Sequence, residues 1–97
     1  MSYRLTNEAA ADIEGILLNG LNAFGTELAL SYHEKLFKLF ELIADFPEMS
    51  RGRLELSVPC RIHPFGSHIV IYTVDENNDV MIVRVRHRHE DWIHDYS

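Results

Sequence analysis

The sequence predicts an α+β fold in which an N-terminal antiparallel helix hairpin packs on one face of a small, mostly antiparallel sheet. Three observations support this fold class. Apolar residues recur at steps of three and four through the first half, and short runs of strand-forming residues separated by turn residues fill the second half. The chain has 97 residues, of which 46% are hydrophobic, which suits one core. We therefore expect residues 1–97 to form a single domain.

The first half is predicted to contain one short strand and two helices. Residues 2–5 alternate weakly and indicate a strand, and Thr6 follows with an oxygen that can cap a helix. The glycines of residues 20–25 end this first helix. The second helix is expected over residues 26–46, because Pro47 disfavours helical geometry at the residue before it. Its apolar positions are Leu28, Tyr32, Leu36, Leu39, Ile43 and Phe46.

The second half is predicted to be a meander of strands. Strands are expected over residues 54–58, 60–65, 68–74 and from 80 to about 89, with Gly66-Ser67 as a turn and residues 75–79 as a hairpin loop. Pro64 makes the second of these strands an edge, a bend or a short strand. Residues 68–74 are nearly all apolar, which indicates a central strand.

Charge is unevenly distributed along the chain. The net charge is −6, but residues 1–50 have three bases against eight acids (3 − 8 = −5), and residues 51–97 have six arginines against seven acids (6 − 7 = −1). The planar guanidinium of arginine suits bidentate contacts with carboxylate or phosphate. We therefore expect a polar recognition surface in the second half and ordinary solvent-facing helix in the acidic first half.

The last predicted strand has three arginines on one face. Side chains alternate across a strand, so Ile82, Arg84, Arg86 and Arg88 are expected on one face and Val83, Val85, His87 and His89 on the other. Successive arginines then lie roughly 7 Å apart, within a Debye length of about 8 Å, and repel one another. Either an anionic partner covers the row, or cross-strand acids such as Asp75 or Glu55 neutralise it.

Other residues are candidates to enlarge this surface. Arg61 and His63 alternate onto one face of a neighbouring segment, where they would extend the cationic patch across the sheet. Tyr72 either stacks on a base or packs in the core. Trp92 either covers the helix hairpin or anchors a partner.

The histidines and the cysteine admit more than one chemistry. His87 and His89 are spaced like a pair of metal ligands, but we expect no metal and no cofactor, with His87 instead packed against the helices. General acid or base work on RNA by an imidazole beside arginines stays open. Cys60 is the one cysteine, so we expect a buried thiol and a protein of the reducing cytoplasm. The sequence has no run of about 20 apolar residues that would indicate a membrane-spanning helix.

Several short motifs, in order along nearly the whole chain, resemble the ParE branch of the RelE/ParE family of bacterial type II toxins. They are Leu5-Thr-Asn-Glu-Ala-Ala-Ala-Asp12, Phe24-Gly25 before Tyr32-x-x-x-Leu36, Phe46-Pro47 with Gly52-Arg53, Arg61-x-x-Pro64-x-Gly66-Ser67-His68-x-x-x-Tyr72, and Arg84-Val-Arg86-His87-x-x-Glu90-Asp91-Trp92. The family's fold is a helix hairpin against a small antiparallel sheet. The resemblance therefore implies the same fold class as the residue pattern.

The resemblance also implies a partner and a target. The partner would be a small, acidic, DNA-binding antitoxin dimer whose tail folds across the toxin, with carboxylates on Arg61, Arg84 and Arg86. The antitoxin- or target-binding set would be Arg61, His63, Tyr72, Arg84, Arg86, Arg88 and Trp92. ParE-type toxins act on DNA gyrase, so the free protein is expected to be a gyrase inhibitor rather than an enzyme.

Two alternatives remain open at the level of sequence. The RelE branch cleaves messenger RNA on the ribosome, and here Arg61, Arg84 and His87 would be its catalytic residues. The predicted pI of 5.4 disfavours this, since an acidic protein binds RNA weakly, and we do not expect direct nucleic-acid binding. The third hypothesis is an antitoxin-binding remnant with no activity on a target.

Overall fold

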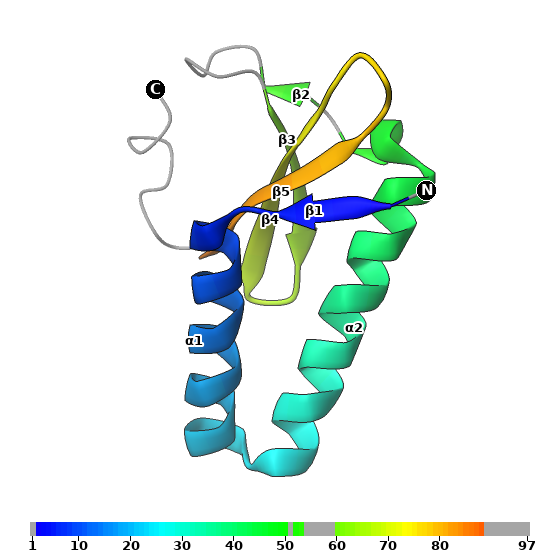
Figure 1. Ribbon diagram of the computed structural model, residues 1–97. Helices are drawn as coiled ribbons and strands as arrows, with labels where there is room; N and C mark the ends of the chain where they lie inside the picture. The colour runs from blue at the N-terminus through cyan, green and yellow to red at the C-terminus, as the bar shows by residue number, and fades with distance from the viewer. Residues whose placement is uncertain (1, 51, 54–59, 89–97) are drawn as a thin grey trace.

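The computed structural model describes residues 2–50, 52–53 and 60–88, and it confirms the predicted fold class (Figure 1). The elements in chain order are β1 (Tyr3–Leu5), α1 (Asn7–Phe24), α2 (Thr26–Asp45), the short 3-10 helix η1 (Pro47–Met49), β2 (Gly52–Arg53), β3 (Cys60–Phe65), β4 (His68–Val74) and β5 (Val80–His87). The strand expected over residues 54–58 lies outside the described residues, as do His89 and Trp92.

The five strands form one sheet in the order β1-β5-β4-β3-β2. Neighbouring strands are antiparallel except β1 and β5, which are parallel. β4 is the central strand, as its apolar sequence predicts. β2 pairs only with Cys60 and Arg61, so the described part of the sheet leaves the rest of β3 at an edge. Pro64, which has no N–H to donate, is tolerated at that edge.

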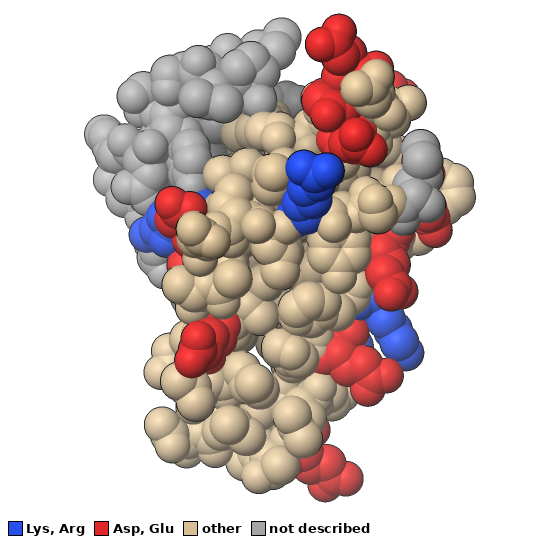
Figure 2. Space-filling view, in the orientation of Figure 1, with Lys and Arg blue, Asp and Glu red and all other residues tan. Residues whose placement is uncertain are grey.

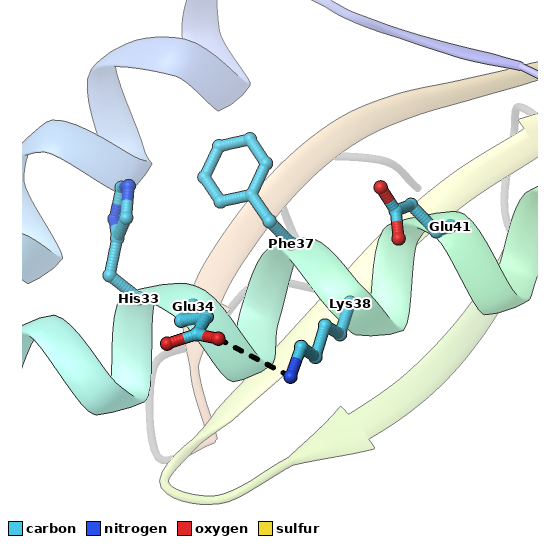
Figure 3. Close-up of a pocket in the computed structure, with 5 residues that line it drawn as sticks. All are labelled: His33, Glu34, Phe37, Lys38 and Glu41. Atoms are coloured by element: carbon cyan, nitrogen blue, oxygen red, sulfur yellow. Dashed lines mark ion pairs between the residues drawn. The ribbon is translucent and has the colours of Figure 1, made fainter.

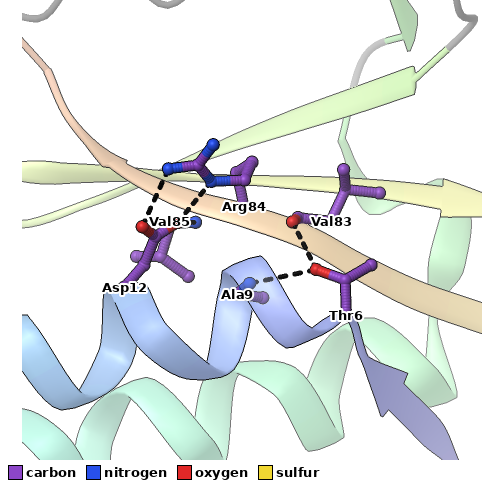
Figure 4. Close-up of polar contacts among 6 residues, drawn as sticks. All are labelled: Thr6, Ala9, Asp12, Val83, Arg84 and Val85. Carbon is purple, nitrogen blue, oxygen red and sulfur yellow. Dashed lines mark hydrogen bonds and ion pairs between the residues drawn. The ribbon is translucent and has the colours of Figure 1, made fainter.

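The helix hairpin begins and turns where the capping residues predict. The Thr6 hydroxyl accepts a hydrogen bond from the Ala9 N–H at 3.0 Å, which caps α1, and donates one to the Val83 carbonyl at 2.7 Å, which ties this cap to β5 (Figure 4). Gly25 joins the helices with φ of +88°, a conformation that glycine adopts without strain. The chain leaves α2 at Phe46, immediately before Pro47.

The main core lies between the helix hairpin and one face of the sheet. Its buried residues are Ala9, Ile13, Leu36, Phe40, Ile43, Val70, Tyr72, Val80, Ile82 and Val85. A smaller cluster on the opposite face consists of Cys60, Ile69 and Ile71, with Ile62 and Val83 packed against it. Both faces of the central strand are therefore apolar, which explains its nearly continuous hydrophobic sequence.

A β-bulge in β5 interrupts the alternation predicted for this strand. Ile71 is paired with Arg84, but the next residue of β4, Tyr72, is paired with Ile82, so Val83 is the extra residue. As a result Ile82 and Val85 both face the helices, whereas Val83 packs in the cluster on the other face. The prediction that Ile82 shares a face with the arginines was wrong, because strict alternation assumes a strand without a bulge.

Charged side chains are sparse at one end of the molecule. In the view of Figure 2 the end of the helix hairpin that contains the α1–α2 turn is largely free of charge, and acidic side chains lie mainly toward its margins. Exposed apolar side chains gather near this turn, among them Leu18, Phe24, Leu28 and Leu30. Neither helix of the described chain is both long and apolar enough to cross a membrane.

Candidate functional site

Arg84 already has an anionic partner within the chain. Its Nε and Nη2 donate to the two carboxylate oxygens of Asp12 on α1, at 2.7 and 2.9 Å, and the same carboxylate accepts the Val85 N–H at 3.1 Å (Figure 4). The side chains are 23% and 16% exposed, so this bidentate pair is largely withdrawn from water. Asp75, one of the expected neutralising acids, instead accepts the N–H groups of Asn77 and Asp79 in the β4–β5 loop.

Asp12 is a partner of Arg84 that the sequence interpretation missed. It lies three residues after Ala9 and four before Ile16, at the margin of the apolar stripe of α1. This spacing is the signal that could have placed its carboxylate against the sheet. β1 pairs with β5 only as far as Ile82, and α1 follows directly after β1. The Asp12 carboxylate on α1 can therefore contact Arg84 on β5, 72 residues further along the chain.

The remaining arginines of the row lie on a mixed surface rather than a cationic one. Arg86 is paired with Ile69, on the same face as Arg84. Arg88 is exposed, and its Nη1 donates to the Gly66 carbonyl at 3.3 Å. The expectation of an entirely cationic face was wrong, since the apolar cluster around Ile71 occupies the same face. Both faces of a central strand must be buried, and β4 supplies apolar groups to each.

Arg61 and His63 do not extend this surface. They are paired with Tyr72 and Val70, which face the helices, so they lie on the opposite face from Arg84 and Arg86. Arg61 donates to the Ser50 carbonyl, and the Ser50 hydroxyl lies 2.6 Å from the His63 Nδ1. Burial lowers the pKa of His63 from its ordinary value. The predicted continuity of the patch was wrong, because sequence spacing does not fix which face two strands share.

Tyr72 has a core position. Its side chain is 0% exposed, and its hydroxyl donates to the Pro47 carbonyl at 2.8 Å. The alternative of core packing is therefore confirmed for this residue, and it cannot stack on a base in this structure. Trp92 lies outside the described residues, so its two alternatives stay predictions.

A second cluster of polar side chains surrounds the end of the β3–β4 turn. His68 and His87 are cross-strand partners with ring centroids 5.4 Å apart. The hydroxyl of Tyr32 on α2 lies 2.8 Å from His68 Nδ1 and 3.1 Å from the Phe65 carbonyl, and accepts the Ser67 N–H at 3.2 Å. Burial raises the pKa of Tyr32, and the Ser67 N–H opposes that rise. The expectation that His87 faces the helices is confirmed.

Tyr32, Ser67, His68 and His87 of this cluster help to line a pocket of about 450 Å³ between the helix hairpin and the sheet. Its apolar wall includes Ile16, Ala23, Phe24, Leu28 and Ala29. Its polar lining residues are Asn19, Ser31, Tyr32, Lys35, Ser67, His68 and His87. The volume is typical of binding pockets, which usually range from about 300 to 1,000 Å³. The sequence interpretation missed this site because Tyr32 was assigned only to the apolar stripe of its helix.

A second hollow lies on the surface of α2 alone (Figure 3). The His33 and Phe37 rings lie 4.8 Å apart, and Lys38 pairs with Glu34 at 3.3 Å across one helical turn. Because all five lining residues come from a single helix, the side chains do not converge from different elements. Such an exposed i,i+4 pair stabilises a helix by only about 0.3–0.5 kcal/mol. We therefore assign no chemistry to this hollow.

Comparison with known proteins places this arrangement in a family. The model of a family described as the ParE toxin of the type II toxin-antitoxin system, parDE, matches residues 3–92. The chain is 35% identical over 86 residues to Toxin ParE1 of Caulobacter vibrioides, covering 89% of this chain and 88% of that protein. It is also similar to a solved structure described as the chromosomal ParDE TA system from P. aeruginosa, with a TM-score of 0.74, 22% identity, and coverage of 90% of this chain and 95% of that one. That likeness supports the fold, and the family match with the Caulobacter relative shows that this chain belongs to the ParE toxin family of type II toxin-antitoxin systems.

Proposed function

We propose that this protein is the toxin of a toxin-antitoxin pair, that a small acidic antitoxin neutralises it, and that the free toxin inhibits DNA gyrase. The observation that supports this most strongly is the family match over residues 3–92, together with a relative of nearly equal length named Toxin ParE1. The antitoxin is proposed to be a DNA-binding dimer with a tail that folds across the toxin.

The surface chemistry restricts where that tail makes charged contacts. Arg84 is held by Asp12, and Arg61 is held by Ser50 on the opposite face. We propose that Arg88, which is exposed, and Arg86, which shares the face of Arg84, meet carboxylates of the antitoxin at the end of β5 away from β1. The exposed apolar side chains near the α1–α2 turn are typical of a protein-binding surface.

The geometry of three residues disfavours the messenger RNA nuclease as an alternative. Arg84 lies on the face opposite to Arg61 and His87. Arg61 and His87 share a face, but the positions on β4 paired with them, Tyr72 and His68, are four residues apart, or about 13 Å along the strand. This placement disfavours the convergence of the proposed catalytic trio on one phosphate, which general acid–base catalysis requires.

A supercoiling assay with purified gyrase tests the proposed target. The purified protein should inhibit supercoiling in proportion to its concentration, and preincubation with the product of the neighbouring antitoxin gene should restore activity. Unchanged supercoiling at saturating toxin contradicts the target. If that result is accompanied by cleavage of messenger RNA on programmed ribosomes, the nuclease alternative is correct. If expression of the protein alone leaves bacterial growth unchanged, it is an inactive remnant.

A further inference from the structure

One side of α2 has a stripe formed by Glu27, Leu28, Ser31 and Lys35. Residues three and four apart on a helix are neighbours on its surface, so these side chains share one side. The Leu28 side chain is 64% exposed, Glu27 and Lys35 are exposed as well, and Ser31 is partly buried. Phe24, which is 70% exposed, lies just across the turn and lines the same pocket as Leu28. Two large apolar side chains thus lie together at one end of a charged stripe.

The charges of this stripe are arranged symmetrically about Ser31. Glu27 lies four residues before the serine and Lys35 four residues after it, about 6 Å away along the helix axis in each direction. Among the described residues neither of them forms an ion pair, whereas the neighbouring Glu34 and Lys38 pair with each other at 3.3 Å (Figure 3). An acid and a base at equal distances on either side of a small residue make a surface that is complementary to itself under a two-fold rotation.

We propose that two copies of this protein associate through this stripe, with their α2 helices antiparallel and crossing at Ser31. A two-fold axis at the crossing places Glu27 of each copy opposite the partner's Lys35, so that two ion pairs form. The small serine side chains permit a close approach of the two helices. Leu28 of each copy then packs between the partner's Ser31 and the partner's Lys35. This self-association goes beyond the proposed activity on gyrase and does not depend on it.

The chemistry of the stripe favours a second copy over an acidic partner. An acidic tail is complementary to Lys35 but repels Glu27, whereas a second copy matches both charges. The net charge of −6 repels two copies at long range, but the Debye length of about 8 Å at physiological salt leaves adjacent charges dominant. Exposed ion pairs contribute little to affinity. Burial of Leu28 and Phe24 must therefore supply most of it, and we expect a dimer that dissociates on dilution.

Charge exchange tests the pairing. Sedimentation equilibrium of the full-length protein should show a monomer–dimer equilibrium. Glu27→Lys and Lys35→Glu should each weaken dimerisation at least about tenfold, because each change places like charges opposite one another at two positions. An equimolar mixture of these two variants should form heterodimers, since both contacts are then between opposite charges. The double variant Glu27→Lys/Lys35→Glu should dimerise like the wild type, which also shows that neither change prevents folding.

The neighbouring ion pair provides the control for net charge. Glu34→Lys and Lys38→Glu repeat the same two charge changes on the same helix, but the proposed packing does not place these residues opposite each other. Mixing these two variants should therefore produce no comparable gain in heterodimer. If it produces the same gain as mixing the Glu27 and Lys35 variants, only net charge matters and the proposed crossing at Ser31 is wrong.

A second pair of variants tests the apolar contact. Leu28→Ser should weaken dimerisation about tenfold, and Leu42→Ser, at a leucine 44% exposed further along α2, should leave it unchanged. A protein that stays monomeric up to about 1 mM overturns the proposal, as does a mixture of the Glu27 and Lys35 variants that forms no heterodimer. If the protein is monomeric and Leu28→Ser instead weakens antitoxin binding, the antitoxin covers this stripe and the proposal is wrong.

Discussion

At the scale of single residues, the Asp12–Arg84 pair joins the helix hairpin to the last strand. Three hydrogen bonds converge on one carboxylate, two from the guanidinium and one from the Val85 N–H (Figure 4). The Val85 N–H lies beyond the end of β1, where β5 has no described strand beside it on that edge. The carboxylate thus satisfies a backbone donor that the sheet leaves unpaired, as well as the guanidinium.

Removing this carboxylate should destabilise the protein measurably. We expect Asp12→Ala to lower the free energy of unfolding by about 2–3 kcal/mol, because it removes the carboxylate that accepts two hydrogen bonds from the Arg84 guanidinium and one from the Val85 N–H. Urea denaturation measures this, with Glu14→Ala as the control on an exposed position of the same helix, expected to change stability by less than about 0.5 kcal/mol. Adding Arg84→Met to Asp12→Ala should recover part of the loss. If Asp12→Ala and Glu14→Ala change the free energy of unfolding equally, the Asp12–Arg84 pair does not stabilise the fold.

His63 should make stability depend on pH in a defined direction. Burial lowers its pKa below the ordinary value of 6.5, so the unfolded chain takes up a proton at this residue at higher pH than the folded chain does. Its contribution to stability is complete above pH 6.5 and is lost as the pH falls from there toward the folded pKa. We expect the loss of stability between about pH 7.5 and 5.5 to be smaller in His63→Gln than in the wild type. Urea denaturation at several pH values in this range gives the stability of each protein. If the stability of His63→Gln and of the wild type falls equally with pH, His63 is not the residue responsible.

At the scale of elements, the β5 bulge decides which residues meet the core and which meet the outer face. Because Val83 is an extra residue in β5, each residue after it lies on the face opposite to the one it would have in a regular strand. Without the bulge, Arg84 would share a face with Ile82 and point toward the hydrophobic core. With it, Val80, Ile82 and Val85 all reach the core, and Arg84 lies at the outer margin, where it meets Asp12.

The β3–β4 turn depends on a glycine for two separate reasons. Gly66 has φ of +54°, and a Cβ added there would lie 2.6 Å from the Tyr32 hydroxyl, which hydrogen bonds hold in place. We expect Gly66→Ala to lower the free energy of unfolding by about 1–3 kcal/mol. Gly15→Ala, in the interior of α1 where the added Cβ would meet no other part of the protein, should instead raise it by about 0.5–1 kcal/mol. Thermal unfolding of both variants measures these changes. If both variants raise the stability, or both lower it, the special requirement for glycine at position 66 is refuted.

At the scale of the whole molecule, an acidic protein is proposed to recruit an acidic partner. The net charge of −6 opposes association with an acidic antitoxin at long range, so local arginines must attract the tail. Arg86 and Arg88 are the candidates, and their effect should appear mainly in the association rate and its dependence on salt.

Charge reversal at one of these positions tests that role. We expect Arg88→Glu to slow antitoxin association about tenfold at low salt, with the difference shrinking as salt is raised. Lys38→Glu changes the net charge equally but lies on α2, in the hollow of Figure 3, and should slow association less. Surface plasmon resonance at several salt concentrations measures both. If the two variants slow association equally, only the net charge matters and Arg88 is not a contact residue.

The sequence by itself determined the fold class, both helices and the limits of β3 and β4 to within a residue or two. These depend on local signals: the cap at Thr6, the glycine at the hairpin turn, the proline after α2 and the apolar run of the central strand. Ordered motifs also pointed to the family that the comparisons show.

Only the tertiary structure decided how the polar residues are distributed. It placed Arg61 and Arg84 on opposite faces, gave Arg84 the carboxylate of Asp12, and brought Tyr32, His68 and His87 together around a pocket. The physical reason is that facing depends on strand register and on one bulge, and a shift of a single residue exchanges the two faces. Periodicity along one segment reports which side chains share a face, but it does not report which face of the sheet the next segment presents to the helices.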